Sequence, residues 1–349
     1  MQVEYILVGQ GLCGSFMSHY LQKANKTFVV IDNNKNITSS KIASGIINPI
    51  TGRRFVKTWM IDELLPFCLN AYNNCGINKQ IITQCDSIDF HTTPQMKIAF
   101  EERLLEEHQY LSVIENDTIL KQYFNYSFGA GKISPCYLLD INTFLKSVKE
   151  KLISTNSFYE NEFNVNDLIL KDTEIKYHHL TAAKIIFCDG SNGFNNPWFK
   201  ILPYSPNKGE VLLVEIPDLP RTNIYKSGFS IVPWQNGLFW IGSSYEWNFI
   251  NNLPTELFRK KVEFFVEQFL KLPYKIVDHF AAVRPANIER RPFVGLHPLH
   301  SQVGIFNGMG TKGCSLAPYF ANEFVNHLTN NIELNPLVDV KRFAKILAR

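Results

Sequence analysis

Long apolar segments and a charge of one sign are both missing from this sequence of 349 residues. Apolar runs such as 211–214 and 185–188 have the length of a strand, whereas a membrane-spanning helix needs roughly 20 residues, so no such helix is expected. The 35 Lys and Arg oppose 32 Asp and Glu, which excludes nucleic-acid binding by a strong positive field alone. Hydrophobic residues make up 45%, which is typical of a soluble globular protein, here long enough for two domains.

Paired cysteines and metal-ligand spacings are missing too. The seven cysteines form no CxxC pair, and the nine histidines form no HxH or HExxH, so neither a disulfide framework nor a metal site is expected. The first residues lack the basic segment and longer apolar stretch of a signal peptide. These absences predict a reducing, cytoplasmic location and no metal.

The first 32 residues carry the clearest pattern. An apolar run at 3–8 leads into the glycines Gly9, Gly11 and Gly14, helical spacing follows, and a second apolar run ends in Asp32, 18 positions beyond Gly14. In such a βαβ unit the glycines allow the sharp turn, the approach of a pyrophosphate and close helix packing. The acid would accept hydrogen bonds from a ribose 2′-hydroxyl; alternatively, it only caps the following turn.

A second GxGxxG run spans 308–313 and precedes a helix with apolar residues every three or four positions. Glu333 lies 20 residues beyond Gly313 but ends no apolar strand, so a second dinucleotide fingerprint is not expected. We expect instead a helix N-terminus whose amides face an electron-rich part of a cofactor ring, with a simple packing turn as the alternative.

The segments between these runs predict a mixed fold without further βα repeats after the first unit. Strand-like segments occur at 162–165, 184–188, 209–215, 230–233 and 237–243, and helical ones at 64–72, 138–152 and 255–270. The later strands are typical of an antiparallel sheet with aromatic lining.

Several segments, in chain order, give the sequence a resemblance to a known family: GQGLCG with Asp32, SSKIASG at 39–45, CDG at 188–190, VRPANIERRPFVG at 283–295 and GMGTKGCSLAP at 308–318. Together they resemble the D-amino-acid oxidase superfamily of FAD-dependent amine oxidoreductases. Within this superfamily, these motifs are most similar to those of glycine and sarcosine oxidases and of the FAD domain of the bifunctional tRNA wobble-uridine modification enzyme.

The resemblance implies an α/β plus α+β fold, in which a Rossmann-like, glutathione-reductase-like FAD domain is interleaved with an antiparallel-sheet substrate domain. Residues 1–50, 132–200 and 285–349 would form the FAD domain, and residues 51–131 and 201–284 the substrate domain. Sarcosine-oxidase-type members tether the flavin through a cysteine near the arginine motif. The corresponding stretch 280–291 contains no cysteine, so noncovalent FAD is expected.

The resemblance also assigns positions around FAD. They are Gly9, Gly11 and Gly14 at the pyrophosphate, Asp32 at the ribose, Ser39, Ser40, Ser44 and Gly45 around pyrophosphate and flavin, Val165 and Gly190 at the adenine, and Gly310, Thr311, Lys312 and Gly313 at the flavin pyrimidine end.

Three residues are candidates for catalysis. Arg284 matches the arginine that grips a substrate carboxylate in glycine-oxidase-like members; alternatively, it pairs with an acid such as Glu289. A further arginine of some members falls at Thr311, so the carboxylate pocket is not fully reproduced. Tyr245 would enter a pocket over the flavin or belong to the core. Lys208 would stabilise reduced flavin or developing superoxide, or be solvated.

The reaction implied is oxidation of a C–N bond in an amine or amino acid by hydride transfer to flavin N5, with oxygen or another acceptor taking the electrons. Two alternatives stay open. One is action on a modified tRNA wobble uridine, motivated by Arg53, Arg54 and Lys57; the other is a flavin-binding partner subunit without its own turnover.

Overall fold

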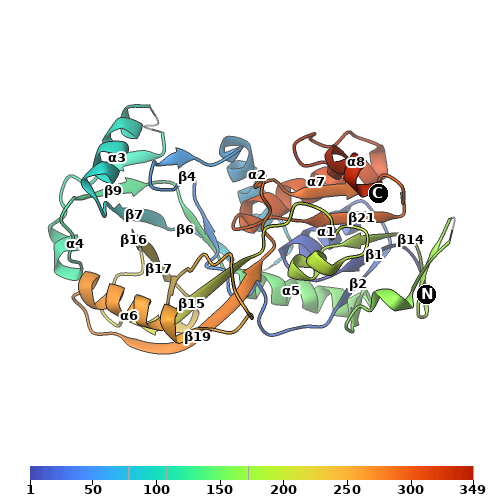
Figure 1. Cartoon of the computed structure of the whole chain (residues 1–349), viewed down its shortest axis with the longest axis horizontal. Coiled ribbons are helices and arrows are strands. Elements are labelled where there is room, and N and C mark those ends of the chain that lie inside the picture. Colours follow the sequence, from blue (N-terminus) through green and yellow to red (C-terminus); the bar gives the residue numbers. More distant parts are fainter. Residues whose placement is uncertain (78, 107–108, 172, 349) are drawn as a thin grey trace.

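Two large sheets organise the fold and lie in two lobes side by side (Figure 1). The structure is a computed structural model that describes residues 1–77, 79–106, 109–171 and 173–348. Within these ranges no helix combines the length and apolar character needed to cross a bilayer.

The first sheet is built on parallel strands. Its central strand β1 pairs with β2 and β14, and β14 pairs with β13 through its first residues and with β21 through its last. The strands are β1 (Gln2–Val8), β2 (Phe28–Asp32), β11 (Phe158–Glu160), β12 (Leu168–Leu170), β13 (Ile175–Tyr177), β14 (Leu180–Phe187), β20 (Phe293–Leu296) and β21 (Val303–Asn307). Because β1, β2, β14 and β21 run in parallel, their carboxyl ends meet at one edge, where open α/β sheets bind ligands.

The second sheet has the order β19-β15-β18-β17-β16-β7-β9-β8, and its neighbours are antiparallel except for β16 and β7. Its strands are β7 (Asp86–Phe90), β8 (Leu111–Val113), β9 (Ala130–Ile133), β15 (Asn207–Glu215), β16 (Asn223–Ser227), β17 (Phe229–Pro233), β18 (Phe239–Gly242) and β19 (Lys275–Arg284). The chain therefore crosses between the lobes more than once. The predicted domain limits stay a prediction.

Smaller elements complete the fold. β3 (Ile46–Ile47), β10 (Tyr137–Leu139) and β6 (Ile82–Gln84) form a three-stranded sheet, and β4 (Ile50–Thr51) pairs with β5 (Val56–Lys57). The helices are α1 (Leu12–Lys23), α2 (Ile61–Asn73), α3 (Pro94–Glu106), α4 (Thr118–Tyr123), α5 (Ile141–Ser154), α6 (Glu256–Phe269), α7 (Gly313–Asn330) and α8 (Ala344–Leu347).

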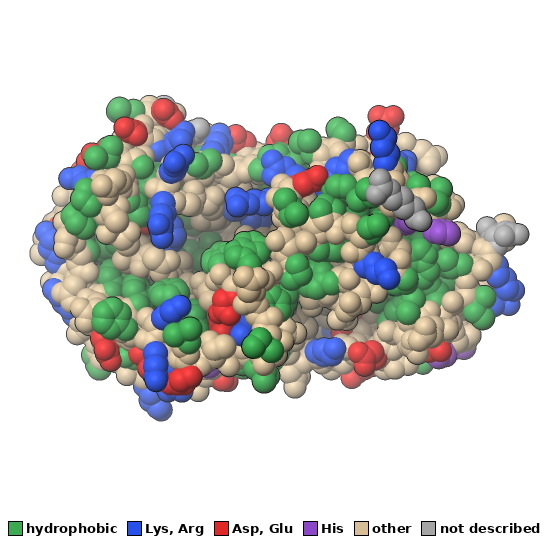
Figure 2. Space-filling model, in the orientation of Figure 1, with side chains coloured by type: hydrophobic (Ala, Val, Ile, Leu, Met, Phe, Trp, Pro, Cys, Tyr) green, Lys and Arg blue, Asp and Glu red, His purple; other side chains and the backbone are tan. Residues whose placement is uncertain are grey.

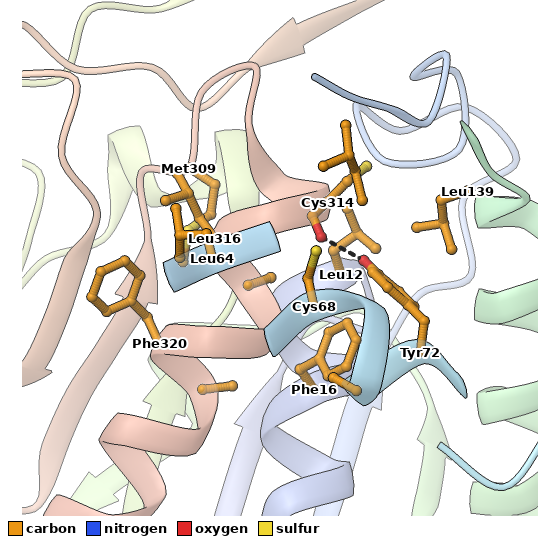
Figure 3. Packing of buried hydrophobic residues seen from close by; sticks show 14 of the residues in the cluster. Leu12, Phe16, Leu64, Cys68, Tyr72, Leu139, Met309, Cys314, Leu316 and Phe320 are labelled. Carbon is orange, nitrogen blue, oxygen red and sulfur yellow. Dashed lines mark hydrogen bonds between the residues drawn. The ribbon is translucent and has the colours of Figure 1, made fainter. Parts of the chain in front are cut away.

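The core beside the first sheet packs α1, α2, α5 and α7 together (Figure 3). Phe16 of α1 contacts the rings of Tyr72 and Phe144 at centroid distances of 5.2 and 5.0 Å. The Tyr72 hydroxyl donates a 2.8 Å hydrogen bond to the carbonyl of Cys314. This buried bond fixes the first turn of α7, and therefore the glycine run before it, against α2.

Two of the expected segments differ in the structure. The expected strand at 162–165 is wrong, because a short 3-10 turn begins at Val165 and the Asn164 side chain caps it. The expected helix at 138–152 begins only at Ile141. Residues before it belong to β10, and the Asp140 carboxylate accepts a 3.0 Å bond from the amide of Thr143, which makes Asp140 the N-cap.

Candidate active site

A cavity of about 1340 Å³ is lined by the carboxyl edge of the first sheet and by one face of the second. Figure 2 shows a hollow between the lobes with Lys and Arg side chains near it. Pockets for one small ligand usually enclose about 300–1000 Å³. The cavity therefore has room for a dinucleotide together with a substrate.

The turn between β1 and α1 requires its glycines. Gly9 has a φ of +98°, and a Cβ there would lie 2.6 Å from the carbonyl oxygen of Cys188. A Cβ on Gly14 would lie 1.8 Å from the carbonyl oxygen of Gly9, so the helix packs on the turn as predicted. Gly11 is the N-cap without a side-chain bond, and it lines the cavity with Gly9. Apart from the Leu12 amide, which donates to Ser40, the first amides of α1 are thus available to an anion.

Asp32 ends β2 and lines the same cavity. Its two carboxylate oxygens accept 2.7 Å bonds from the backbone amides of Gln10 and Asn34. The turn-capping contact considered from the sequence therefore exists, and it also ties Asp32 to the glycine turn. Each oxygen keeps a further lone pair, so the carboxylate has acceptor capacity for ribose hydroxyls.

Replacing Asp32 by Ala is expected to weaken FAD binding roughly ten- to a hundred-fold, because hydrogen bonds to a charged group contribute about 1.5–3 kcal/mol. Titration of FAD into apoprotein measures the effect, and Asp32→Asn, which keeps the shape but not the charge, is the matched variant. Equal dissociation constants with a lowered Tm for Asp32→Ala would place Asp32 in the scaffold only.

Some residues of the loop after β2 line the cavity, and another packs against β10. Ser39, Ser40 and Ser44 line the cavity, and the Ser40 hydroxyl accepts a 3.4 Å bond from the amide of Leu12. Gly45 does not line it: its φ is +79°, and a Cβ would lie 2.1 Å from the carbonyl oxygen of Leu139. The structure therefore gives Gly45 a packing role against β10 instead of a cofactor contact.

Val165, which begins a 3-10 turn after β11, and Gly190, which lies three residues beyond the end of β14, both line the cavity. Between them and the glycine turn lies Asp189, whose carboxylate accepts bonds of 2.9 and 3.2 Å from the side-chain amides of Asn307 and Asn196. Burial raises the pKa of Asp189 to about 6, although these two bonds lower it. Sequence reasoning did not assign Asp189 or Asn307 to the site, yet Asn307 ends β21 and Asp189 lies two residues beyond the end of β14, as Asp32 ends β2.

The second glycine run reaches the cavity, since Gly310, Thr311, Lys312 and Gly313 all line it at the start of α7. The Lys312 ammonium donates a 3.2 Å bond to the hydroxyl of Thr58. No carboxylate in the described ranges forms an ion pair with it. Burial lowers the pKa of Lys312 to about 8. A positive charge is thus held at the expected flavin pyrimidine end.

Replacing Lys312 by Met is expected to stabilise the apoprotein at pH 7. The pKa of Lys312 falls from 10.5 to about 8 on folding, so the unfolded chain binds the proton more tightly, and stability rises with pH between those values. Below pH 8 the buried charge costs up to about 3 kcal/mol, which Met removes. Urea unfolding of the apoprotein at pH 7 and 10 checks this, with exposed Lys260→Met as control. An equal gain at both pH values would contradict it.

Arg284 ends β19 and points into the cavity. Its guanidinium donates to the side-chain oxygen of Asn207, to the Ser243 hydroxyl at 2.7 Å and to the Ser244 carbonyl at 3.1 Å. The guanidinium also lies over the Tyr245 ring, 4.7 Å from its centre. Neutral groups thus orient this arginine from several sides.

The predicted alternative partner of Arg284 is wrong, because Glu289 pairs with Arg342 at 3.0 Å. In the described part of the chain no carboxylate forms an ion pair with Arg284. Burial lowers the pKa of Arg284 below its ordinary value, yet guanidinium stays charged at neutral pH. A half-buried charge without a counter-charge suits an anionic ligand.

Tyr245 and Lys208 differ in placement. Tyr245 lines the cavity and is 60% exposed, so it is not a core residue. Lys208 does not line the cavity. It is buried, and its ammonium lies 3.1 Å from Glu210 and 3.8 Å from Glu246. Because successive residues of a strand face opposite sides of the sheet, Lys208 points away from the face that carries Gly209, and neither role considered for it from the sequence is supported.

Sequence reasoning also missed the residue beneath Arg284. A Cβ on Gly209 would lie 2.0 Å from the Nη2 atom of Arg284. The register pairs Asn207 with Arg284 and Gly209 with Ala282, so the guanidinium leans across β15. The glycine of the tripeptide Asn207-Lys208-Gly209 was the feature that could have indicated this contact. The sequence alone did not indicate which strand the tripeptide would pair with.

The comparisons agree with this geometry. Residues 4–326 match the family model described as FAD dependent oxidoreductase. A curated relative, glycine oxidase of Bacillus subtilis (strain 168), is 22% identical over 365 residues, covering 95% of this chain and 94% of that protein.

Solved structures share the fold at low identity. Glycine oxidase from Geobacillus kaustophilus has a TM-score of 0.78 at 16% identity, covering 95% of this chain and 96% of that one. L-proline dehydrogenase from P. horikoshii has a TM-score of 0.78 at 14% identity, covering 99% and 98%. L-alpha-glycerophosphate oxidase from Mycoplasma pneumoniae, solved with FAD bound, has a TM-score of 0.76 at 15% identity, covering 96% and 97%.

The glycine turn, the acid at the end of β2 and the glycine run before α7 all border one cavity, and each fits the FAD expected there. The predicted fold class and cofactor are therefore confirmed, together with the resemblance on which they rested. On these grounds the chain belongs to the family of FAD dependent oxidoreductases.

Proposed function

We propose that the protein oxidises the C–N bond of an amine or amino acid that carries a carboxylate, with FAD held noncovalently. The observation that carries this proposal is Arg284: a half-buried guanidinium without a described carboxylate partner, in the same cavity as the FAD loops. The names of the similar glycine oxidases and of L-proline dehydrogenase support an amino-acid substrate.

Binding of FAD involves both ends of the cavity. Gly9, Gly11 and the first amides of α1 would hold the pyrophosphate, and Asp32 the ribose. The run 310–313 would face the flavin, where Lys312 adds a positive charge. When bound, FAD supplies the acceptor for a hydride at N5.

The chain's own contribution to the reaction is positioning and exclusion of water. Arg284 binds the substrate carboxylate through its charged fork, and Tyr245 packs against the same guanidinium. The substrate then loses a hydride from carbon and a proton from nitrogen, which leaves a C=N bond that water hydrolyses. Lys208 has no part in this proposal, because it lies on the other face of the sheet.

Anaerobic bleaching of the flavin absorbance tests the proposal. The holoprotein is mixed with glycine, sarcosine, proline and other amino acids, and separately with tRNA bearing a carboxymethylaminomethyl group. We expect bleaching by at least one free amino acid and its loss in Arg284→Met. Bleaching by tRNA alone would assign the site to the modified uridine, and no bleaching by any of them would favour a partner subunit without turnover.

A further inference from the structure

The floor of the cavity extends well beyond Arg284. It is the inner face of the second sheet, and residues of β19, β15, β18, β17, β16 and β7 all line the cavity. Parts of this floor carry little side-chain bulk, at Gly209, Gly228, Ser230 and Ser87, whereas the Trp240 ring lies over Gly242. A substrate as small as glycine would leave most of this floor uncovered.

A charged pair lies at the far end of the floor. The Lys226 ammonium is 2.5 Å from the carboxylate of Asp89, and both residues line the cavity. Strand register places them there: Lys226 pairs with Asp89 on one side and with Ser230 on the other. Directly paired residues of neighbouring strands share a face. The pairing continues from Ser230 to Gly242 and then to Val211, so Lys226 and Asp89 lie on the same face of the sheet as Gly209 and Arg284.

Fold stability alone does not account for the Lys226–Asp89 pair. Asp89 is fully buried, and its Oδ1 atom has no hydrogen-bond partner among the described residues. Burying an ion pair generally stabilises a fold no better than apolar residues would. The Lys226 side chain is 28% exposed. Its ammonium has three N–H donors, and one of them donates to Asp89. The Asp89 carboxylate therefore orients the Lys226 ammonium so that its other N–H donors face the cavity.

A further cation and several hydroxyls border the same cavity. Arg53 lines it, on a loop whose Phe55 ring lies 5.9 Å from the ring of His91, directly after β7. Ser87 and Thr92 line it as well. Two cations, Lys226 and Arg53, thus face one carboxylate, Asp89, and the net positive charge favours a carboxylate or a phosphate over a cationic group.

Arg284 and the Lys226–Asp89 pair are too far apart to bind one small anion together. Four strand steps of about 4.8 Å and an offset of four residues at about 3.3 Å each separate Arg284 from Lys226, so their Cα atoms lie on the order of 20 Å apart. Arg284 leans across Gly209 toward the middle of the sheet, whereas Lys226 leans toward Asp89 and away from it. The charged ends therefore remain on the order of 15 Å apart.

We propose that the substrate is an elongated amine with two anionic groups, a carboxylate at Arg284 and a distal carboxylate or phosphate at Lys226. This inference rests on the proposed function, since it takes Arg284 as the site of the first carboxylate. Lys226 then determines specificity, and Asp89 is a positioning residue that orients it.

A length series of acids bound to the holoprotein tests the proposal. Straight-chain monocarboxylates and α,ω-dicarboxylates of increasing length are titrated while the flavin absorbance is followed. We expect the longest dicarboxylates to bind roughly tenfold or more tightly than monocarboxylates of equal length, as a charged hydrogen bond would give. This advantage should vanish in Lys226→Met and persist in Lys260→Met. ω-Phosphonocarboxylates of the same lengths identify which distal anion is preferred.

The outcomes separate this inference from the proposed function. Short monocarboxylates should bind wild type and Lys226→Met alike but fail with Arg284→Met; if they bind independently of Arg284, the proposed function is wrong. A flat length series, or an equal advantage in Lys226→Met, overturns the distal site. Should Lys226→Met not fold, Ser230→Leu replaces it, because a bulky side chain in the middle of the floor should weaken only the long acids.

Discussion

Replacing Arg284 by Met should raise the KM for the amino-acid substrate roughly 30-fold to several thousand-fold while FAD stays bound. Truncating one partner of a buried, hydrogen-bonded charge pair costs about 2–5 kcal/mol. The guanidinium is held by Asn207, Ser243 and Ser244, so it is oriented before substrate arrives and loses little freedom on binding. Met keeps most of the apolar stem but offers no donor to a carboxylate.

Anaerobic flavin reduction at varied substrate concentration measures this effect. The matched control is Arg259→Met, because Arg259 forms an ion pair with Glu263 on α6 and does not line the cavity. Removal of a half-buried charge without a counter-charge should not lower the Tm of the apoprotein. An unchanged KM in Arg284→Met would reassign the arginine to the scaffold.

Replacing Gly209 by Ala should reproduce much of this loss without touching the arginine. The new Cβ would lie 2.0 Å from Nη2 and 2.3 Å from Cζ of Arg284, so the guanidinium must leave its bonds to Ser243 and Ser244. We expect the KM to rise about tenfold or more, since a displacement of about 1 Å in a site can cost about a hundredfold.

A double-mutant cycle distinguishes this displacement from general damage to the sheet. If Gly209→Ala acts through the guanidinium, it should change the KM little in the Arg284→Met background. An equal rise in both backgrounds would mean that the methyl group disturbs β15 itself, and Gly209 would then have no specific relation to the carboxylate site.

Local features of the chain were predictable because their physics is local. The first apolar run, the glycine turn and Asp32 lie within 32 residues, and the turn follows from steric limits on each backbone position. The start of α7 after the second glycine run was predictable for the same reason. The family's motifs then placed FAD beside both turns.

Pairings between distant strands decided the rest of the site. The face on which Lys208 and Gly209 point depends on the register of β15 with β19, and a shift of one residue would exchange their sides. Lys226 meets Asp89 across 137 residues of chain, a contact that no local pattern indicates. The sequence by itself thus determined the dinucleotide turns, their acid and the cofactor class. Only the tertiary structure decided which charges face the cavity, because sheet register and burial arise from contacts between segments far apart in the chain.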